Sequence, residues 1–199
     1  MKKPIKKTVI IAFEGMSGAG KTTTIRMLAE NVVKGAGIVS QIELPTLRQD
    51  GLITSKRYLD AEIEKAETIR LMCKTCKFIL VDRTFLTTLA YSYARSKIVN
   101  DQGSHRKLVR YFRCLDAKYQ FPRPTYLFFL LTRIDCSIRR RSRYTNQNPS
   151  SRWFNHRFLK HFEAFYCQRR IGFNMPRPFI IDTTAMTSKE VASAISEYL

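Results

Sequence analysis

The sequence predicts an α/β fold in which a five-stranded parallel sheet is flanked by helices on both faces. Short apolar, β-branched runs alternate with longer segments of helical character along the 199 residues, and this alternation is typical of strands joined by crossover helices. The first run leads directly into a glycine-rich loop and then a helix. No internal repeat or linker divides the chain, and its length suits one domain. We therefore expect a single domain over residues 1–199, with a basic N-terminal arm over residues 1–7 and a strand order that the pattern leaves open.

The first half of the chain contains three of the expected strands. The expected elements are, in order, strand Thr8–Phe13, helix Thr23–Asn31, strand Ile38–Leu44, helix 54–75 and strand Lys77–Val81. The strands are apolar runs of the kind that a buried parallel sheet requires. Glycines at 35 and 37 end the first helix, and Pro45 closes the second strand. The helix over 54–75 is mixed in charge, with apolar residues at three- and four-residue spacing.

The second half continues the alternation and ends on a helix. The expected elements are helices Thr84–Val99 and Ser104–Tyr119, strand Thr125–Leu131, helices Arg133–Arg143 and Arg152–Arg170, strand Phe179–Asp182 and helix Thr187–Leu199. Polar residues 100–104 separate the first two helices, and polar residues 144–151 connect the next two. Strand Thr125–Leu131 is the most hydrophobic candidate. The last helix opens with Thr187-Ser-Lys-Glu190, which is a capping-box pattern.

The glycine-rich loop predicts a nucleoside triphosphate site. Its residues are Gly15, Met16, Ser17, Gly18, Ala19, Gly20, Lys21 and Thr22, which fit the spacing G-x-x-x-x-G-K-[ST] at every fixed position. In this context the glycines let backbone amides converge on phosphate, and the helix N-terminus adds partial positive charge. We expect Gly15 to Thr23 to hold the phosphates, Lys21 to reach the β- and γ-phosphates, and Thr22 to bind Mg²⁺. The alternative is a glycine-rich turn that carries a lysine by chance, which the strand and helix on either side disfavour.

Polar residues at the ends of the predicted strands are the next candidates, because the carboxyl ends of parallel strands surround a ligand crevice. Asp82 follows an apolar strand, which is the usual setting for a carboxylate that holds magnesium. It could instead deprotonate an attacking hydroxyl, or cap the helix that opens at Thr84. Arg83 would bring a planar cation suited to gripping phosphate. Glu43 ends the second predicted strand.

Four arginines lie close together after the fourth predicted strand, at positions 139, 140, 141 and 143. Arg139 and Arg143 are four residues apart and therefore share one helical face. Because phosphoryl transfer spreads negative charge over oxygens, arginines brought over the site by a closing lid would stabilise it. We therefore expect a lid over about residues 139–155. The alternative is a solvated basic face.

The overall charge indicates anionic partners but does not identify them. The formal net charge is +19 and the pI is near 10.1, so the chain should attract polyanions such as nucleic acid. A nucleotide-dependent nucleic-acid-binding regulator is thus one alternative, although no RNA-binding motif is found. Five scattered cysteines indicate a reducing compartment, the cytoplasm, and no apolar run is long enough to span a bilayer. The oligomeric state is open, with a homodimer as one state that the sequence allows.

Several segments resemble the thymidylate kinases, within the wider nucleoside and nucleoside-monophosphate kinases. The similar segments are FEGMSGAGKTTT (Phe13–Thr24), DRTFLTTLAYS (Asp82–Ser92), the R-x-x-x-R pair Arg139 and Arg143, and FIIDTTAMTSKEVASAI near the C-terminus. The resemblance implies a P-loop kinase fold, ATP and Mg²⁺ as cofactors, and a nucleoside monophosphate such as dTMP as phosphate acceptor. It also implies that Thr22 and Asp82 hold the magnesium and that Arg83 aligns the acceptor.

The sequence also departs from that family. Ser17 stands where the family often has an acidic residue, and Glu43-Leu44-Pro45 replaces an arginine-glutamate-proline signature. Glu43 with Pro45, and the turn Asp82-Arg83-Thr84, instead resemble deoxynucleoside kinases. In a nucleoside kinase, or another small-molecule kinase of this kind, Glu43 or Asp82 would act as general base for a hydroxyl.

Overall fold

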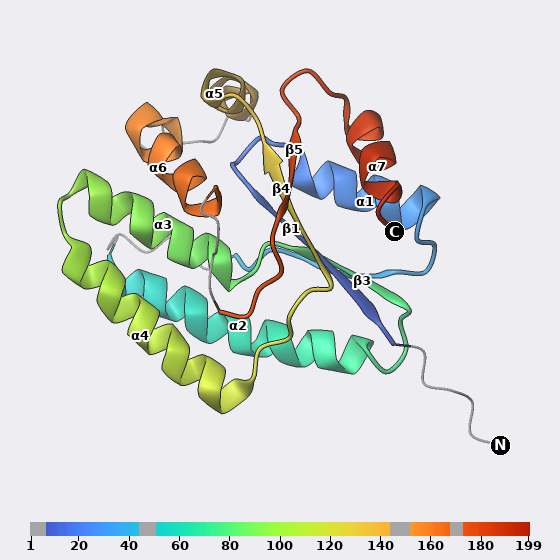
Figure 1. Ribbon diagram of the computed structural model, residues 1–199, viewed down its shortest axis with the longest axis horizontal. Helices are drawn as coiled ribbons and strands as arrows, with labels where there is room; N and C mark the ends of the chain where they lie inside the picture. Colours follow the sequence, from blue (N-terminus) through green and yellow to red (C-terminus); the bar gives the residue numbers. More distant parts are fainter. Residues whose placement is uncertain (1–6, 44–50, 144–151, 168–172) are drawn as a thin grey trace.

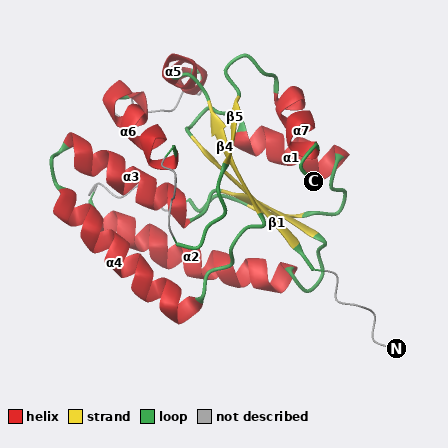
Figure 2. Ribbon diagram, in the orientation of Figure 1, coloured by secondary structure: helices red, strands yellow, loops and turns green. Residues whose placement is uncertain are grey.

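Five parallel strands form the centre of the molecule, in the order β2-β3-β1-β4-β5 (Figure 2). They are β1 (Val9–Gly15), β2 (Gly37–Val39), β3 (Phe78–Asp82), β4 (Tyr126–Leu131) and β5 (Phe179–Asp182). The computed structural model describes residues 7–43, 51–143, 152–167 and 173–199. The prediction of a five-stranded parallel sheet is confirmed, and β1 lies at its centre between β3 and β4.

Helices cover both faces of the sheet (Figure 1). They are α1 (Lys21–Asn31), α2 (Leu52–Met72), α3 (Phe85–Ile98), α4 (Gln102–Tyr119), α5 (Ile134–Ser142), α6 (His156–Tyr166) and α7 (Ser188–Ser196). The pair α1 and α7 packs on one face, and α2, α3, α4 and α6 cover the other. Helix α5 lies beyond the carboxyl ends of the strands, beside α6.

Two hydrophobic clusters hold these layers together, one on each face of the sheet. In β4, Phe128 and Leu130 belong to the cluster under α1 and α7, whereas Leu127 and Phe129 belong to the cluster under the other helices. This division follows from the two-residue period of a strand, and it explains why a strand buried on both faces is an unbroken apolar run. All four side chains are fully buried.

Two predicted elements are wrong in extent. The strand predicted over Ile38–Leu44 ends at Val39, because only Gly37–Val39 pairs with β3 at this edge of the sheet. The helix predicted over Arg152–Arg170 is interrupted at Asn155, whose side chain caps α6 by accepting the Phe158 amide at 2.9 Å. A 3₁₀ turn, Arg152–Phe154, precedes that cap.

Some predictions fall on residues outside the described ranges. These are nearly all of the basic arm over residues 1–7, the connection 144–151 within the predicted lid, and the end of the helix predicted to reach Arg170. The predicted capping box at the start of α7 lies within the described ranges. It is confirmed, because the side chains of Thr187 and Glu190 each accept a hydrogen bond from the other's backbone amide.

Candidate functional site

The loop between β1 and α1 depends on glycine where it passes closest to the sheet. Gly15 has a φ of 135°, and a Cβ atom built on it would lie 2.4 Å from the carbonyl oxygen of Leu130. Because that oxygen belongs to the neighbouring strand backbone, no side chain could be accommodated at this position. The first predicted glycine is therefore required for the turn itself.

The carbonyl groups of the loop are held by side chains around it. The bonds run from Lys21 Nζ to Met16 O, from Ser137 Oγ to Ser17 O, from Arg140 Nη1 to Gly18 O and from Thr183 Oγ1 to Ala19 O. Within the loop, the Ala19 amide donates to Met16 O at 3.3 Å. Helix α1 begins without a side-chain cap on its first amides. This arrangement is suited to binding an anion.

Lys21 is buried under the loop, and only 6% of it is exposed. Its ammonium donates to Gly15 O at 3.1 Å and to Met16 O at 2.7 Å. Burial, with a further contribution from Arg83, lowers the pKa of Lys21 to about 7, although Asp82 and Glu14 act in the opposite direction. Because this ammonium is poorly solvated, a polyanion bound in the loop would strongly stabilise its charged form.

Thr22 and Asp82 lie together at the carboxyl ends of β1 and β3. The Thr22 hydroxyl donates to Asp82 Oδ2 at 2.7 Å. The other carboxylate oxygen, Oδ1, is buried and has no hydrogen-bond partner among the described residues. An unpartnered carboxylate oxygen beside a hydroxyl fits a magnesium ion, which needs few protein ligands when phosphates supply others. The predicted capping role of Asp82 is wrong, since Thr84 caps α3 by accepting the Leu86 amide.

Arg83 reaches from the end of β3 to the phosphate loop. Its guanidinium donates to Gln41 Oε1 at 2.8 Å and to Gly15 O and Thr87 Oγ1 at 3.3 Å each. Its φ of 64° lies in the left-handed region, which costs about 1–2 kcal/mol for a residue with a side chain. Such strain persists only where neighbouring contacts hold it, and it is common at functional sites.

A second arginine approaches Arg83 from α5. Arg141 donates to Ser17 Oγ in the loop, and its guanidinium lies 5.9 Å from the centroid of the Trp153 ring. Arg83 lies 5.8 Å from the same centroid. Burial and the charge of Arg83 lower the pKa of Arg141. Neither arginine forms an ion pair with a carboxylate of the described residues. The positive charges of both side chains are therefore available to an anionic ligand.

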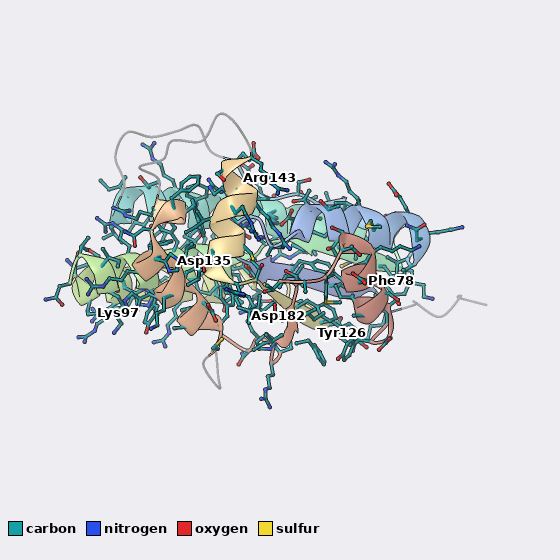
Figure 3. The ribbon with its side chains drawn as sticks, turned by 90° about the horizontal axis from the view of Figure 1, so that it is seen from above. Phe78, Lys97, Tyr126, Asp135, Arg143 and Asp182 are labelled. Carbon is teal, nitrogen blue, oxygen red and sulfur yellow. The ribbon has the colours of Figure 1, made fainter. Side chains whose placement is uncertain are left out.

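A pocket of about 450 Å³ opens on the other side of the loop. Its walls are the loop from Gly18 to Gly20, the first turn of α1, α5 and the connection from β5 to α7. Arg140 and Arg143 line it from α5. Figure 3 shows Arg143 at the end of α5 opposite Asp135. The volume is within the range of small-molecule sites.

The structure brings some predicted residues together and leaves others apart. The loop from Gly15 to Thr22, Asp82 and Arg83 meet at the carboxyl ends of the strands. The exposed side chain of Arg139 donates to Cys136 Sγ of its own helix, whereas Arg140 and Arg141 contact the loop. Glu43 is exposed beyond β2. The functional roles of Arg139, Arg143 and Glu43 remain predictions.

Sequence reasoning missed one carboxylate at this site. Glu14 in β1 is fully buried and accepts hydrogen bonds from the Thr84 amide and hydroxyl, from Thr87 Oγ1 at 2.5 Å and from Tyr166 OH at 2.8 Å. It ties the central strand to α3 and α6. In the sequence Glu14 follows directly after the predicted strand Thr8–Phe13, and no role was predicted for it from the sequence.

The excess positive charge lies partly away from the site. The exposed basic residues of α4 are Arg106, Lys107, Arg110, Arg113 and Lys118. Non-specific binding of polyanions, which the net charge predicts, remains a prediction, as does a homodimer. In the described ranges no group of three or more His, Cys, Asp or Glu side chains could hold a metal. No helix there has the length and apolar character needed to cross a membrane.

Comparison with known proteins gives a consistent set of relatives. No family model matches the chain. Thymidylate kinases from two strains of Ureaplasma parvum serovar 3 are each 25% identical over 232 aligned positions, covering 100% of this chain and 92% of theirs. The structure of thymidylate kinase from Candida albicans superposes with a TM-score of 0.70 at 15% identity, over 96% of this chain and 91% of that one.

A deoxyadenosine kinase from M. mycoides with bound dATP has the same TM-score of 0.70 at 16% identity, over 96% of this chain and 98% of its own. These two structures share the fold with this chain, and the curated sequences are similar to it along its whole length. In sequence this chain is therefore similar to thymidylate kinases along its whole length, and in fold it is similar to thymidylate kinase and deoxyadenosine kinase.

Proposed function

We propose that this protein transfers the γ-phosphoryl group of ATP, with Mg²⁺, to a nucleoside monophosphate, with dTMP as the first candidate. The observation that carries the proposal is the arrangement of Lys21, Thr22 and Asp82 around an uncapped helix N-terminus. It combines a phosphate-binding loop, a buried ammonium and a pair of oxygen atoms that fits magnesium, one from the loop and one from the end of β3. Similarity to thymidylate kinases along the whole chain supports the choice of acceptor.

The pocket beside the loop is the proposed site for the nucleoside of ATP. It adjoins Gly18, Ala19 and Gly20 and is lined by Arg140 and Arg143. A triphosphate in the loop would leave its sugar and base next to this space. Arg143 would then lie beside the nucleotide, and Arg139 would join it only if residues 139–155 move as a lid.

The cations on the opposite side of the loop favour an acceptor that is already phosphorylated. Arg83 and Arg141 approach the same indole ring and are not neutralised by described carboxylates. Planar guanidinium groups suit bidentate binding of phosphate. Glu43, one of the two predicted bases of a nucleoside kinase, is exposed beyond β2. A nucleoside acceptor is therefore the second candidate, supported by the fold shared with deoxyadenosine kinase.

The residues of the chain divide the work between binding and charge stabilisation. The loop amides and the start of α1 hold the β- and γ-phosphates, and Lys21 neutralises charge on the transferring group. Thr22 and Asp82 would hold Mg²⁺, which supplies charge neutralisation between the phosphates when bound. Arg83 orients the acceptor phosphate, which is itself the nucleophile and needs no strong base. We expect this single domain to act in the cytoplasm, in keeping with the predicted reducing compartment.

The direct test is transfer of labelled γ-phosphate from ATP to a panel of nucleosides and nucleoside monophosphates. We expect product from monophosphates, with dTMP above the others. Product from nucleosides alone would make the second candidate correct and assign the role of base to Glu43 or Asp82. No transfer to either class, with and without Mg²⁺, would contradict the proposed function.

Triphosphate binding at pH 8 should take up close to one proton. The pKa of Lys21 is lowered to about 7 in the free protein, so the amine is mostly neutral at pH 8. Bound phosphates favour the ammonium form and raise this pKa. Affinity should therefore fall as pH rises above 7, by up to about tenfold per pH unit. Calorimetry in buffers of different ionisation enthalpy measures the uptake, and Lys21→Met should lack it. Equal affinity at pH 7 and pH 9 would contradict this assignment.

A further inference from the structure

The turn between β3 and α3 carries two proposed functional side chains on a strained backbone. Asp82 ends β3, Arg83 follows with its φ of 64°, and Thr84 caps α3 in an extended conformation. The side chains of Asp82 and Arg83 contact different parts of the loop, at Thr22 and at Gly15. The orientation of the two side chains relative to each other thus depends on the backbone conformation of this one turn.

Lys65 of α2 holds the turn by its carbonyl groups. Its ammonium donates to Asp82 O at 2.9 Å and to Arg83 O at 2.7 Å. Only 6% of the residue is exposed. The two carbonyls on either side of the strained peptide therefore converge on a single buried cation. A lysine buried to this extent is rare unless it is paired.

Glu14 holds the other side of the same turn. Its Oε1 accepts from the Thr84 amide and from the Thr84 hydroxyl, each at 2.7 Å. In addition, the Arg83 amide donates to Phe13 O at 3.0 Å. The turn is thus bound through carbonyls by α2 and through amides by β1.

The surroundings of Lys65 act on its positive charge in both directions. Burial lowers the pKa of Lys65, and Arg83 acts in the same direction, whereas Glu62, Glu14 and Asp82 favour the charged form. Burial also raises the pKa of Glu62, to about 7. A neutral side chain of the same length would avoid this desolvation. However, such a side chain could not donate hydrogen bonds to both Asp82 O and Arg83 O, as Lys65 does.

We propose that Lys65 is a positioning residue for phosphoryl transfer: with Glu14 it clamps the Asp82–Arg83–Thr84 turn and thereby fixes the directions of the Asp82 and Arg83 side chains. The inference rests on the proposed function for its catalytic consequence, but the clamp itself is a property of the folded chain. Lys65 acts through the turn and not on the substrate, because its ammonium donates to the two carbonyls.

The test compares Lys65→Met, Lys65→Arg and the control Lys56→Met with the wild-type chain. Lys56 lies on the same helix, over the Tyr111 ring and away from the turn. For Lys65→Met we expect kcat to fall about 10- to 100-fold and the Mg²⁺ concentration for half-maximal rate to rise, because supporting contacts of a metal site have effects of this size. The KM for ATP should change less, since the loop is not altered. Lys65→Arg should recover part of kcat, and Lys56→Met should match the wild type.

Hydrogen exchange gives a readout that does not depend on turnover. The amides of Arg83 and Thr84 should exchange faster in Lys65→Met and remain protected in Lys56→Met. Unchanged kcat, or reduced kcat without faster exchange at these amides, would overturn the proposal. If the wild-type chain phosphorylates no acceptor, the proposed function fails separately, and exchange together with Mg²⁺·ATP binding still decides whether Lys65 holds the turn.

Discussion

Replacing Lys21 with methionine should reduce phosphoryl transfer by about 10³-fold or more while leaving the fold intact. Removal of a single preorganised donor from a reacting oxyanion costs about 10²–10³ in kcat. Lys21 is in addition buried, and bound phosphates favour its charged form. Methionine has a similar length and fills the space under the loop. It also removes an ammonium whose pKa is lowered to about 7 by burial, so the free protein should lose little stability.

The measurement is single-turnover transfer from labelled ATP, with thermal unfolding monitored on the same samples. Lys107→Met on the exposed face of α4 is the matched control and should behave as the wild type. A Lys21→Met variant with full turnover would contradict the assignment of the loop as the phosphate site. A variant that unfolds would be replaced by Lys21→Arg, which keeps the charge but cannot occupy the same position between Gly15 O and Met16 O.

The sequence was sufficient for the phosphate loop because the loop is local. Its residues are contiguous, and the strand before it and the helix after it fix their geometry. Asp82 could likewise be predicted from its place at the end of an apolar strand, since parallel strands end at one edge of the sheet. The strand order and the length of β2 could not, because they depend on pairing between distant segments.

The arginines of α5 show a second kind of information that the sequence does not provide. The spacing of Arg139 and Arg143 places them on one helical face, but the sequence does not tell which face meets the loop. That choice depends on how α5 packs, and the structure directs Arg140 and Arg141 to the loop instead. Lys65 escaped notice for a similar reason, since it was one charge among many on α2 until folding placed it against the turn after β3.

Replacing Asp82 with asparagine should be the second most damaging change, and it separates two roles for this residue. Asparagine keeps the shape and can still accept the Thr22 hydroxyl that now bonds to Oδ2 at 2.7 Å. It removes the negative charge and can turn an amide donor toward the position of Oδ1, the oxygen that lacks a partner. We expect kcat to fall at least about 100-fold and half-saturation to need far more Mg²⁺, because an amide is a weaker ligand than a carboxylate.

The magnesium dependence is the decisive part of that measurement. If Asp82 holds the metal, raising Mg²⁺ should restore part of the rate with dTMP as acceptor. If Asp82 is a general base for a nucleoside hydroxyl, the Mg²⁺ requirement should be unchanged and no concentration should restore the rate. Asp60→Asn on the exposed side of α2 is the matched control, because Asp60 contacts Tyr111 and not the loop. A steep rate loss without any change in Mg²⁺ dependence would thus reassign Asp82 from metal ligand to base.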